Sequence, residues 1–342
     1  MSTLSRRSLL VAGTAGVLGT VAGCGGSRPG TGGSGAAPSG VTASTGPSGT
    51  ISVSPSVSPS AGLPVPKAWQ PSSIDIQPAV KLRAVRLIEA LGSWPEGGQG
   101  QGAARQRAAA AGYDPALAAQ AAALLGPSPR AALQVLEAQY GGILSDSASV
   151  LVVCRQWTDD TGGYAGGAVA VGGTTVDVRL SRAQPQWRVT ALQPAQPGPA
   201  VSGLSAPAHA VLASDAITLP PAALADVRSG NVHDSALEAM LTLARAHRIE
   251  LSVVRSGHPI DVFGTSRPSD HPKGRAFDVW RIDGHAVVDP STPHALVDGF
   301  MRAAAAAGSY NVGGPRQLSG GTGNQFFSDD THHDHVHVGF AT

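Results

Sequence analysis

Residues 25–68 contain almost only Gly, Ser, Thr, Pro, Ala and Val, and this composition excludes a packed core over that part of the chain. Arg28 is the only charged residue in the stretch before Lys67. Such a segment buries too little apolar surface to offset the entropy that is lost on ordering. We therefore expect a disordered tether here, and we expect the folded part to begin near residue 69.

A second Pro/Gly/Ser-rich stretch, residues 196–207, divides the folded part into the segments 69–195 and 208–342. Their combined length exceeds that of one average domain, so we expect two domains. The formal net charge of the whole chain is +1, and the sequence has no long basic run. This charge balance argues against a nucleic-acid partner.

Residues 1–24 have the pattern of an export signal. Arg6 and Arg7 precede an apolar stretch from Leu9 to Ala22 that is too short to span a bilayer as a stable anchor. Small residues lead up to Cys24, and this junction resembles a bacterial lipobox, which implies acylation of Cys24 after cleavage. We therefore expect that the protein is exported and that a lipid anchors it to the outer face of the cytoplasmic membrane, in the cell envelope. The alternative is an ordinary secretory signal with a Cys near its cleavage site.

The segment 69–195 predicts helices followed by strands, which is an α+β arrangement. Apolar side chains recur at helical spacing over 79–91. Ala-rich stretches predict further helices over 103–111, 115–125 and 130–140. Strand-like runs follow at 149–157, 166–172, 174–181 and 186–192, and they predict an antiparallel meander. Cys154 lies in an apolar run and is expected to be a buried, inert thiol. No motif assigns chemistry here, so we expect a spacer or protein-binding role.

A helix and a strand lead into the part of the chain that is rich in His. Residues 234–247 place apolar side chains along one face, with Asp234 as the capping residue. Residues 249–254 follow as a strand. Eight of the 11 His residues lie after residue 250, which makes this part the candidate for a metal site.

Strand alternation and one bend bring three of these side chains together. His271 precedes the strand-like run that carries Asp278, and Gly274 allows the loop to bend so that the imidazole approaches the carboxylate. In a second strand, His335 and His337 point one way while the apolar residues between them point into the core. Two imidazoles and one carboxylate leave a fourth tetrahedral position open, which is typical of a catalytic zinc centre. We predict His271, Asp278 and His337 as ligands of Zn²⁺.

The two motifs resemble those of the LAS zinc peptidases. His-x-x-Gly-x-Ala-x-Asp begins at His271 with a Ser two positions before it, and His-x-His follows tens of residues later. This family contains D-alanyl-D-alanine carboxypeptidases and dipeptidases, L-alanyl-D-glutamate endopeptidases and the hedgehog signalling domain. The resemblance covers roughly residues 210–342. It implies an antiparallel-sheet zinc peptidase domain that acts on peptidoglycan stem peptides.

The resemblance also implies the catalytic residues. Relatives commonly have their catalytic carboxylate three residues before the final ligand, where this chain has Asp334. His335 matches a His that lies beside the metal in relatives and assists the transition state. A base of this kind takes a proton from the zinc-activated water and passes it to the leaving amine. Asp334 is the first choice for this base and His335 the second.

Substrate recognition departs from the family pattern. Many carboxypeptidase relatives carry Ser-Gly-Tyr-Arg, whose Arg holds the terminal carboxylate of the substrate, but this chain has His258 and Pro259 after Ser-Gly. Arg255 or Arg267, together with Ser269 of the first motif, would then bind the substrate. A substrate without a free carboxylate at that point would favour an endopeptidase. The alternative function is a non-catalytic, zinc-stabilised cell-wall or protein binding module, because signalling relatives show that the fold permits it.

Overall fold

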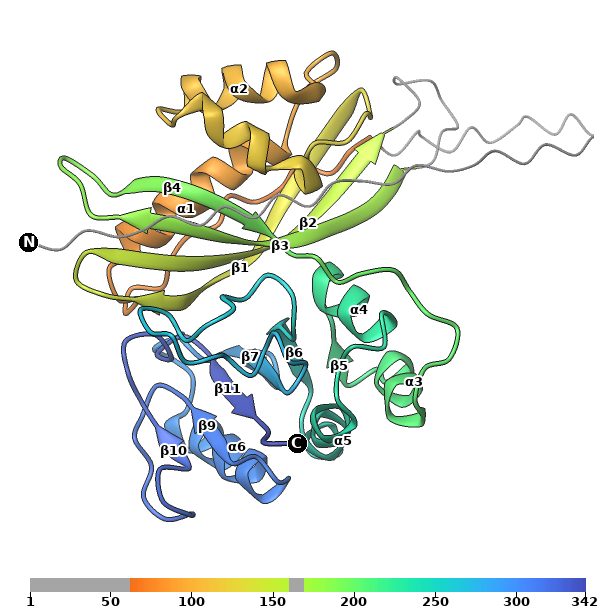
Figure 1. The fold of residues 1–342 in the computed structure, drawn as a ribbon, viewed down its shortest axis with the longest axis vertical. Helices are drawn as coiled ribbons and strands as arrows, with labels where there is room; N and C mark the ends of the chain where they lie inside the picture. Colours follow the sequence, from red (N-terminus) through yellow and green to blue (C-terminus); the bar gives the residue numbers. More distant parts are fainter. Residues whose placement is uncertain (1–61, 160–168) are drawn as a thin grey trace, which may run out of the picture. The chain divides into compact units, whose positions relative to one another are not determined.

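The computed structural model describes residues 62–159 and 169–342, which belong to one compact unit. The predicted signal peptide with Cys24, and the tether up to residue 61, lie outside the described residues, as do residues 160–168. Two sheets with their helices make up the described part, which has an α+β arrangement (Figure 1). No helix of this part is both long enough and apolar enough to cross a membrane.

The first sheet has four antiparallel strands in the order β1-β2-β3-β4. The helices of this segment are α1 (Pro78–Gly92), α2 (Gly100–Ala110) and the short 3-10 helices η1 (Pro115–Gln120) and η2 (Ala122–Leu124). The strands are β1 (Arg130–Ile143), β2 (Ser147–Asp159), β3 (Val169–Ser181) and β4 (Arg188–Pro194). The helix predicted over 79–91 is confirmed as α1, and the antiparallel meander is confirmed as well.

One predicted helix of this segment is wrong, because residues 130–140 form most of β1. Ala favours a helix locally, but β1 pairs with β2 along its whole length and buries side chains in two different clusters. Long-range pairing therefore outweighs the local propensity. The runs predicted over 166–172 and 174–181 form a single strand from Val169 on, because Gly172 and Gly173 stay paired with β2.

The second sheet is mixed, with the strand order β10-β9-β11-β7-β6-β5 and β8 paired to β7. Its strands are β5 (Ile217–Thr218), β6 (Ile249–Val253), β7 (Ala276–Ile282), β8 (His285–Ala286), β9 (Asn311–Gly313), β10 (Phe326–Phe327) and β11 (Val336–Gly339). Its helices are α3 (Ala206–Ala213), α4 (Pro221–Arg228), α5 (Asp234–Ala244) and α6 (His294–Ala306).

We expected a purely antiparallel C-terminal sheet, but the strand directions show a mixed sheet. The central pairs β6–β7, β7–β11 and β11–β9 are antiparallel. The strand β5 runs parallel to β6, and β10 runs parallel to β9. The connection from β5 to β6 contains α4 and α5, and a helical crossover of this kind joins parallel strands.

The helix predicted over 234–247 ends earlier, at Ala244, and its predicted cap is also wrong. His233 occupies the N-cap position, and its side chain makes no capping hydrogen bond. Asp234 is instead the first helical residue, and its carboxylate accepts a hydrogen bond from Oγ of Ser205 at 2.6 Å. An acidic side chain in the first turn still interacts favourably with the helix dipole.

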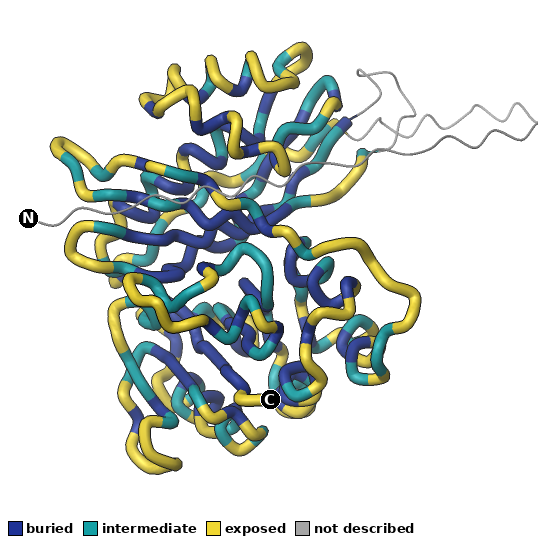
Figure 2. Tube along the Cα trace, viewed as in Figure 1, coloured by how far each residue is buried: buried dark blue, intermediate teal, exposed yellow. Residues whose placement is uncertain are grey.

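Each sheet has its own hydrophobic core, and a third, smaller cluster lies between the two sheets. Val150 and Val152 of β2 belong to the core of the first sheet and α1. Leu151 and Val153, which alternate with them, pack instead against Val253 of β6 in the second sheet. β2 is therefore buried on both faces, which explains its continuous apolar run. Figure 2 shows buried strands in both sheets.

The thiol of Cys154 is buried in the first core, as predicted. Its Sγ lies 3.1 Å from the carbonyl oxygen of Thr174. Burial raises the pKa of this thiol to about 12. At neutral pH the nucleophilic thiolate form is therefore negligible.

Candidate metal centre

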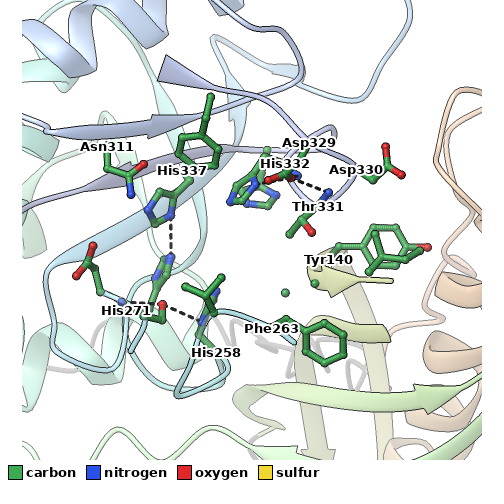
Figure 3. Close-up of a pocket in the computed structure, with 18 of the residues that line it drawn as sticks. Tyr140, His258, Phe263, His271, Asn311, Asp329, Asp330, Thr331, His332 and His337 are labelled. Atoms are coloured by element: carbon green, nitrogen blue, oxygen red, sulfur yellow. Dashed lines mark hydrogen bonds and ion pairs between the residues drawn. The ribbon is translucent and has the colours of Figure 1, made fainter. Parts of the chain in front are cut away.

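Three side chains from distant parts of the second segment converge at one point. Nε2 of His271 lies 3.1 Å from Oδ1 of Asp278 and 3.1 Å from Nδ1 of His337. Nδ1 of His337 lies 3.1 Å from the same Oδ1 of Asp278. Two ligand atoms of a tetrahedral zinc ion stand about 3.3 Å apart, given metal–ligand bonds of about 2.0–2.1 Å. The three atoms therefore fit a single small ion with little movement. Figure 3 shows His271 and His337 facing each other.

Strand register brings two of these residues together. β11 pairs with β7 so that His337 stands opposite Asp278. Side chains directly opposite one another in an antiparallel pair lie on the same face of the sheet. The alternate residues Phe277 and Val338 point into the hydrophobic core, as the sequence predicts.

His271 reaches the site from a loop that bends at Gly274. This glycine has φ +71°, and a Cβ on it would collide with the carbonyl oxygen of Asn231. Its N–H donates to the carbonyl of His271 at 2.8 Å, which closes the turn. The predicted bend is confirmed, and it requires glycine for both conformation and space.

Hydrogen bonds orient the candidate ligand atoms of His271 and Asp278. Nδ1 of His271 donates to the carbonyl oxygen of Val254 at 2.8 Å, so in the neutral imidazole Nε2 carries the free lone pair. Oδ2 of Asp278 accepts a hydrogen bond from Nε2 of Gln139 at 2.6 Å, which leaves Oδ1 directed at the two imidazoles. His271 and Asp278 are both completely buried.

The protonation states of the site suit metal binding. Burial alone would raise the pKa of Asp278, but the neighbouring His271 and His335 and the hydrogen bonds from His271 and His337 hold it well below its usual value. Burial lowers the pKa of His337 to about 4, although Asp278 acts in the opposite direction. At neutral pH the chain therefore offers a carboxylate and a neutral imidazole, which are the forms that ligate metals.

Asp334, the first choice for the base, does not line the cavity and contacts His335, Lys81 and Tyr140 instead. Its Oδ1 lies 2.6 Å from Nδ1 of His335, and its Oδ2 accepts from Nζ of Lys81 at 2.7 Å and from the N–H of Tyr140 at 3.2 Å. The side chain is completely buried, and burial would raise its pKa, but Lys81 and His335 hold that pKa far below its usual value. His335 lies between this carboxylate and the ligands, with its Nε2 3.8 Å from Oδ1 of Asp278.

The three candidate ligands lie beside a cavity of about 720 Å³, and His271 and His337 line its wall. Arg267 and Ser269, two of the predicted substrate-binding residues, line the cavity as well. The end of β1 forms part of another wall with Tyr140, and Figure 3 shows Tyr140 and Phe263 across the cavity from the imidazoles. The remaining lining residues include Gly141, Gly142, Ile143, Leu144, His258, Asn311, Phe327, Asp329, Asp330, His332 and His335.

Arg255, the other predicted substrate-binding residue, is not brought to this cavity. Its Nη1 donates to the carbonyl of Pro197 at 3.3 Å and lies 3.6 Å from Oδ1 of Asp226. The backbone N–H groups of Arg255 and Ser256 donate to Oδ2 of the same carboxylate. Asp226 is fully buried, so this guanidinium serves to balance a buried charge.

Sequence reasoning missed several residues of the site. The ring of His258 stacks on that of His271 with centroids 4.1 Å apart. With His271 and Asp278, His258 also forms a group whose ligand atoms are close enough together to hold an ion. The available signal was its place after Ser256 and Gly257, where many LAS carboxypeptidases carry Tyr. Gln139 and Lys81 come from the first segment, and nothing in their local sequence indicates contact with the site.

A second group of metal-ligand types lies beside the first. Asp75, His333 and Asp334 have ligand atoms close enough to hold an ion. However, the ammonium group of Lys81 contacts both carboxylates, so a cation is already present between them. We therefore regard this group as a buried ion-pair network rather than a metal site.

Comparison of the chain with models of known protein families, with curated proteins and with solved structures finds no match. Among the described residues, groups of His and Asp are placed so that they could hold a metal ion.

Proposed function

We propose that this protein is a zinc-dependent peptidase that hydrolyses peptide bonds of peptidoglycan stem peptides, as a carboxypeptidase or an endopeptidase. The observation that carries the proposal is the equal spacing of the ligand atoms of His271, Asp278 and His337, 3.1 Å for each pair, beside a cavity. Three protein ligands leave a tetrahedral ion one position for water or substrate, as in catalytic zinc sites. The resemblance of the motifs to LAS peptidases supports the same conclusion.

The chain's own residues would handle the protons of the reaction. A bound zinc ion supplies Lewis acidity to the scissile carbonyl and lowers the pKa of a water toward about 7. Nδ1 of His335 faces Oδ1 of Asp334, so in the neutral imidazole with its proton on Nδ1, Nε2 of His335 would be the atom that accepts a proton from the water and returns it to the leaving amine.

The cavity supports a peptide as the substrate. A volume of about 720 Å³ accommodates a short peptide segment. Arg267 is exposed at this cavity and offers a bidentate partner for a carboxylate. Stem peptides carry several carboxylates, so this side chain supports them as the substrate class. We propose that the predicted lipid on Cys24 and the tether over 25–68 keep the enzyme in reach of the cell wall.

Mass spectrometry of peptidoglycan digests tests the proposal. Purified full-length protein in detergent is incubated with cell-wall material, with and without zinc. We expect zinc-dependent release of stem-peptide fragments by the wild type and none by His271→Ala. The matched control is His247→Ala, because His247 pairs with Asp283 outside the cavity and its loss should leave the product unchanged.

The same experiment separates the alternative function. A zinc-stabilised binding module would bind zinc stoichiometrically and release no fragment in any condition. That result, obtained with well-folded protein across the ordinary stem-peptide bonds, would rule out the peptidase.

A further inference from the structure

Two side chains of the first segment make buried contacts with the metal centre of the second. The first is Gln139 of β1, which is 0% exposed. Its Nε2 donates to Oδ2 of Asp278 at 2.6 Å, and its Oε1 accepts a hydrogen bond from Oγ of Ser252 on β6. The amide is therefore held on one side by Ser252 while its other side holds the ligand carboxylate.

This contact constrains how Asp278 can bind an ion. Oδ1 of Asp278 faces His271 and His337, whereas Oδ2 is occupied by Gln139. The hydrogen bond fixes the rotation of the carboxylate and favours ligation through one oxygen only. Groups that orient a ligand in this way usually matter to metal affinity nearly as much as the ligands themselves.

The second side chain is Lys81 of α1, which is also completely buried. Its Nζ lies 2.7 Å from Oδ2 of Asp334 and also contacts Asp75. The N–H of Tyr140, from β1, donates to the same Oδ2 at 3.2 Å. Because Oδ1 of Asp334 holds Nδ1 of His335, the first segment sets the position of that imidazole through Asp334.

We propose that Gln139 and Lys81 are positioning residues of the metal centre, so that the first segment contributes these residues to the site and is not only a spacer. Gln139 orients the ligand Asp278, and Lys81 holds Asp334 behind His335. The packing of Leu151 and Val153 on Val253 holds the two sheets close enough for both contacts to form. The inference about Gln139 requires only metal binding, whereas the inference about Lys81 rests on the proposed function of His335.

Zinc affinity of the full-length protein, measured by competition with a chelator, tests the role of Gln139. We expect Gln139→Leu to bind zinc about 10- to 100-fold more weakly than the wild type. The matched control is Gln156→Leu, since Gln156 is a buried amide of the same sheet that bonds the carbonyls of Gly92 and Leu124. It should change the affinity by less than about threefold, although it loses comparable hydrogen bonds.

A wild-type zinc affinity in folded Gln139→Leu would overturn the proposal. If that variant does not fold, Ser252→Ala provides the second measurement, because it removes the hydroxyl that anchors the amide and that also donates to the backbone carbonyl of Asp278 at 3.3 Å. Weaker zinc binding in Ser252→Ala supports the orienting role, and an unchanged affinity contradicts it. Neither measurement requires peptidase activity, so failure here is distinct from failure of the proposed function.

The role of Lys81 is tested by the nitrogen chemical shifts of His335, which report the tautomer of the ring. In the wild type, Nδ1 of His335 faces Oδ1 of Asp334, a contact that favours the tautomer with the proton on Nδ1. We expect Lys81→Met to give a mixture of tautomers and a kcat at least tenfold lower with KM nearly unchanged, and Lys81→Arg to restore part of both. Lys67→Met, a change at an exposed lysine, is the control. An unchanged His335 spectrum in Lys81→Met would contradict the positioning role.

Discussion

Nδ1 of His335 lies 2.6 Å from Oδ1 of Asp334, and both side chains are buried between the cavity and the ammonium group of Lys81. The carboxylate that sequence reasoning favoured as the base thus lies behind the imidazole that was the second choice. A His whose Nδ1–H is held by a carboxylate has its Nε2 free for proton transfer. This relationship supports the proposal that His335 is the base and that Asp334 orients it.

The first prediction concerns this pair. We expect His335→Gln to lower kcat by about 100- to 10,000-fold, because general acid–base catalysis contributes about that much. Asp334→Asn should also lower kcat, since an amide no longer favours the Nδ1–H tautomer. Both variants should retain about one equivalent of zinc, as measured by elemental analysis. Loss of zinc in His335→Gln would mean that this residue is a ligand instead.

The second prediction concerns the metal itself. Because a ligand that binds only the folded state stabilises it, added zinc should raise the Tm of the wild type. His271→Ala removes one of three ligands, so its Tm should be insensitive to micromolar zinc. Differential scanning calorimetry of protein freed of metal, with and without zinc, measures both shifts. A similar zinc-induced rise in His271→Ala would show that the stabilising ion binds elsewhere.

The third prediction concerns Arg267 and Arg255. Arg267 lines the cavity, so Arg267→Ala should raise KM for a substrate with a free carboxylate at least tenfold. Arg255 balances the buried carboxylate of Asp226, so Arg255→Ala should lower Tm and leave KM nearly unchanged. Steady-state kinetics and thermal unfolding of both variants check this division. A raised KM in Arg255→Ala with an unchanged KM in Arg267→Ala would indicate that Arg255, and not Arg267, binds the substrate.

The fourth prediction concerns Gly274 and the loop of His271. Gly274→Ala combines a positive φ of +71° with a collision against the carbonyl of Asn231, so it should destabilise by more than about 1 kcal/mol and weaken zinc binding. Gly284→Ala is a matched control, because Gly284 has φ +84° and open space around it. Denaturant unfolding should show a clearly larger loss for Gly274→Ala than for Gly284→Ala. Equal losses would exclude a contribution from the collision.

The fifth prediction is a pH dependence of stability from Glu137. Burial raises the pKa of this carboxyl to about 7, although Lys81 acts in the opposite direction. A carboxyl whose folded-state pKa is raised makes its full contribution to stability below about pH 4.5 and loses it as pH rises through about 7. The loss is about 3 kcal/mol.

Glu137→Gln mimics the protonated carboxyl and should therefore be more stable than the wild type at pH 8. At pH 5 the two proteins should be nearly equal in free energy of unfolding. Chemical denaturation at both pH values gives the comparison, and Glu96→Gln, at an exposed position, serves as the control. A Glu137→Gln variant that is less stable than the wild type at pH 8 would mean that the carboxylate is needed there.

Much of the candidate ligand set was predictable because it depends on local periodicity. Side chains alternate across a strand with a period of two, so the sequences around Asp278 and His337 already separate core-facing from site-facing residues. Gly274 likewise marks a bend by its own conformational freedom. The α1 helix was predictable for the same kind of reason. By contrast, the Ala-rich residues 130–140 have a local preference for helix that pairing with β2 overrules.

The sequence by itself determined which side chains can act as ligands, because their type and spacing are local properties of two short motifs. Only the tertiary structure decided which side chains surround and orient these candidate ligands. Gln139 meets Asp278 across 139 residues of chain, and Asp334 is turned toward Lys81 because the packed sheets place that buried ammonium beside it. Contacts of this kind arise where the two sheets pack together. The local sequence pattern of either segment does not indicate which residues of the other segment it will contact. The packing of the two sheets therefore determines the orientation of Asp334, the residue that the motifs predict as the base.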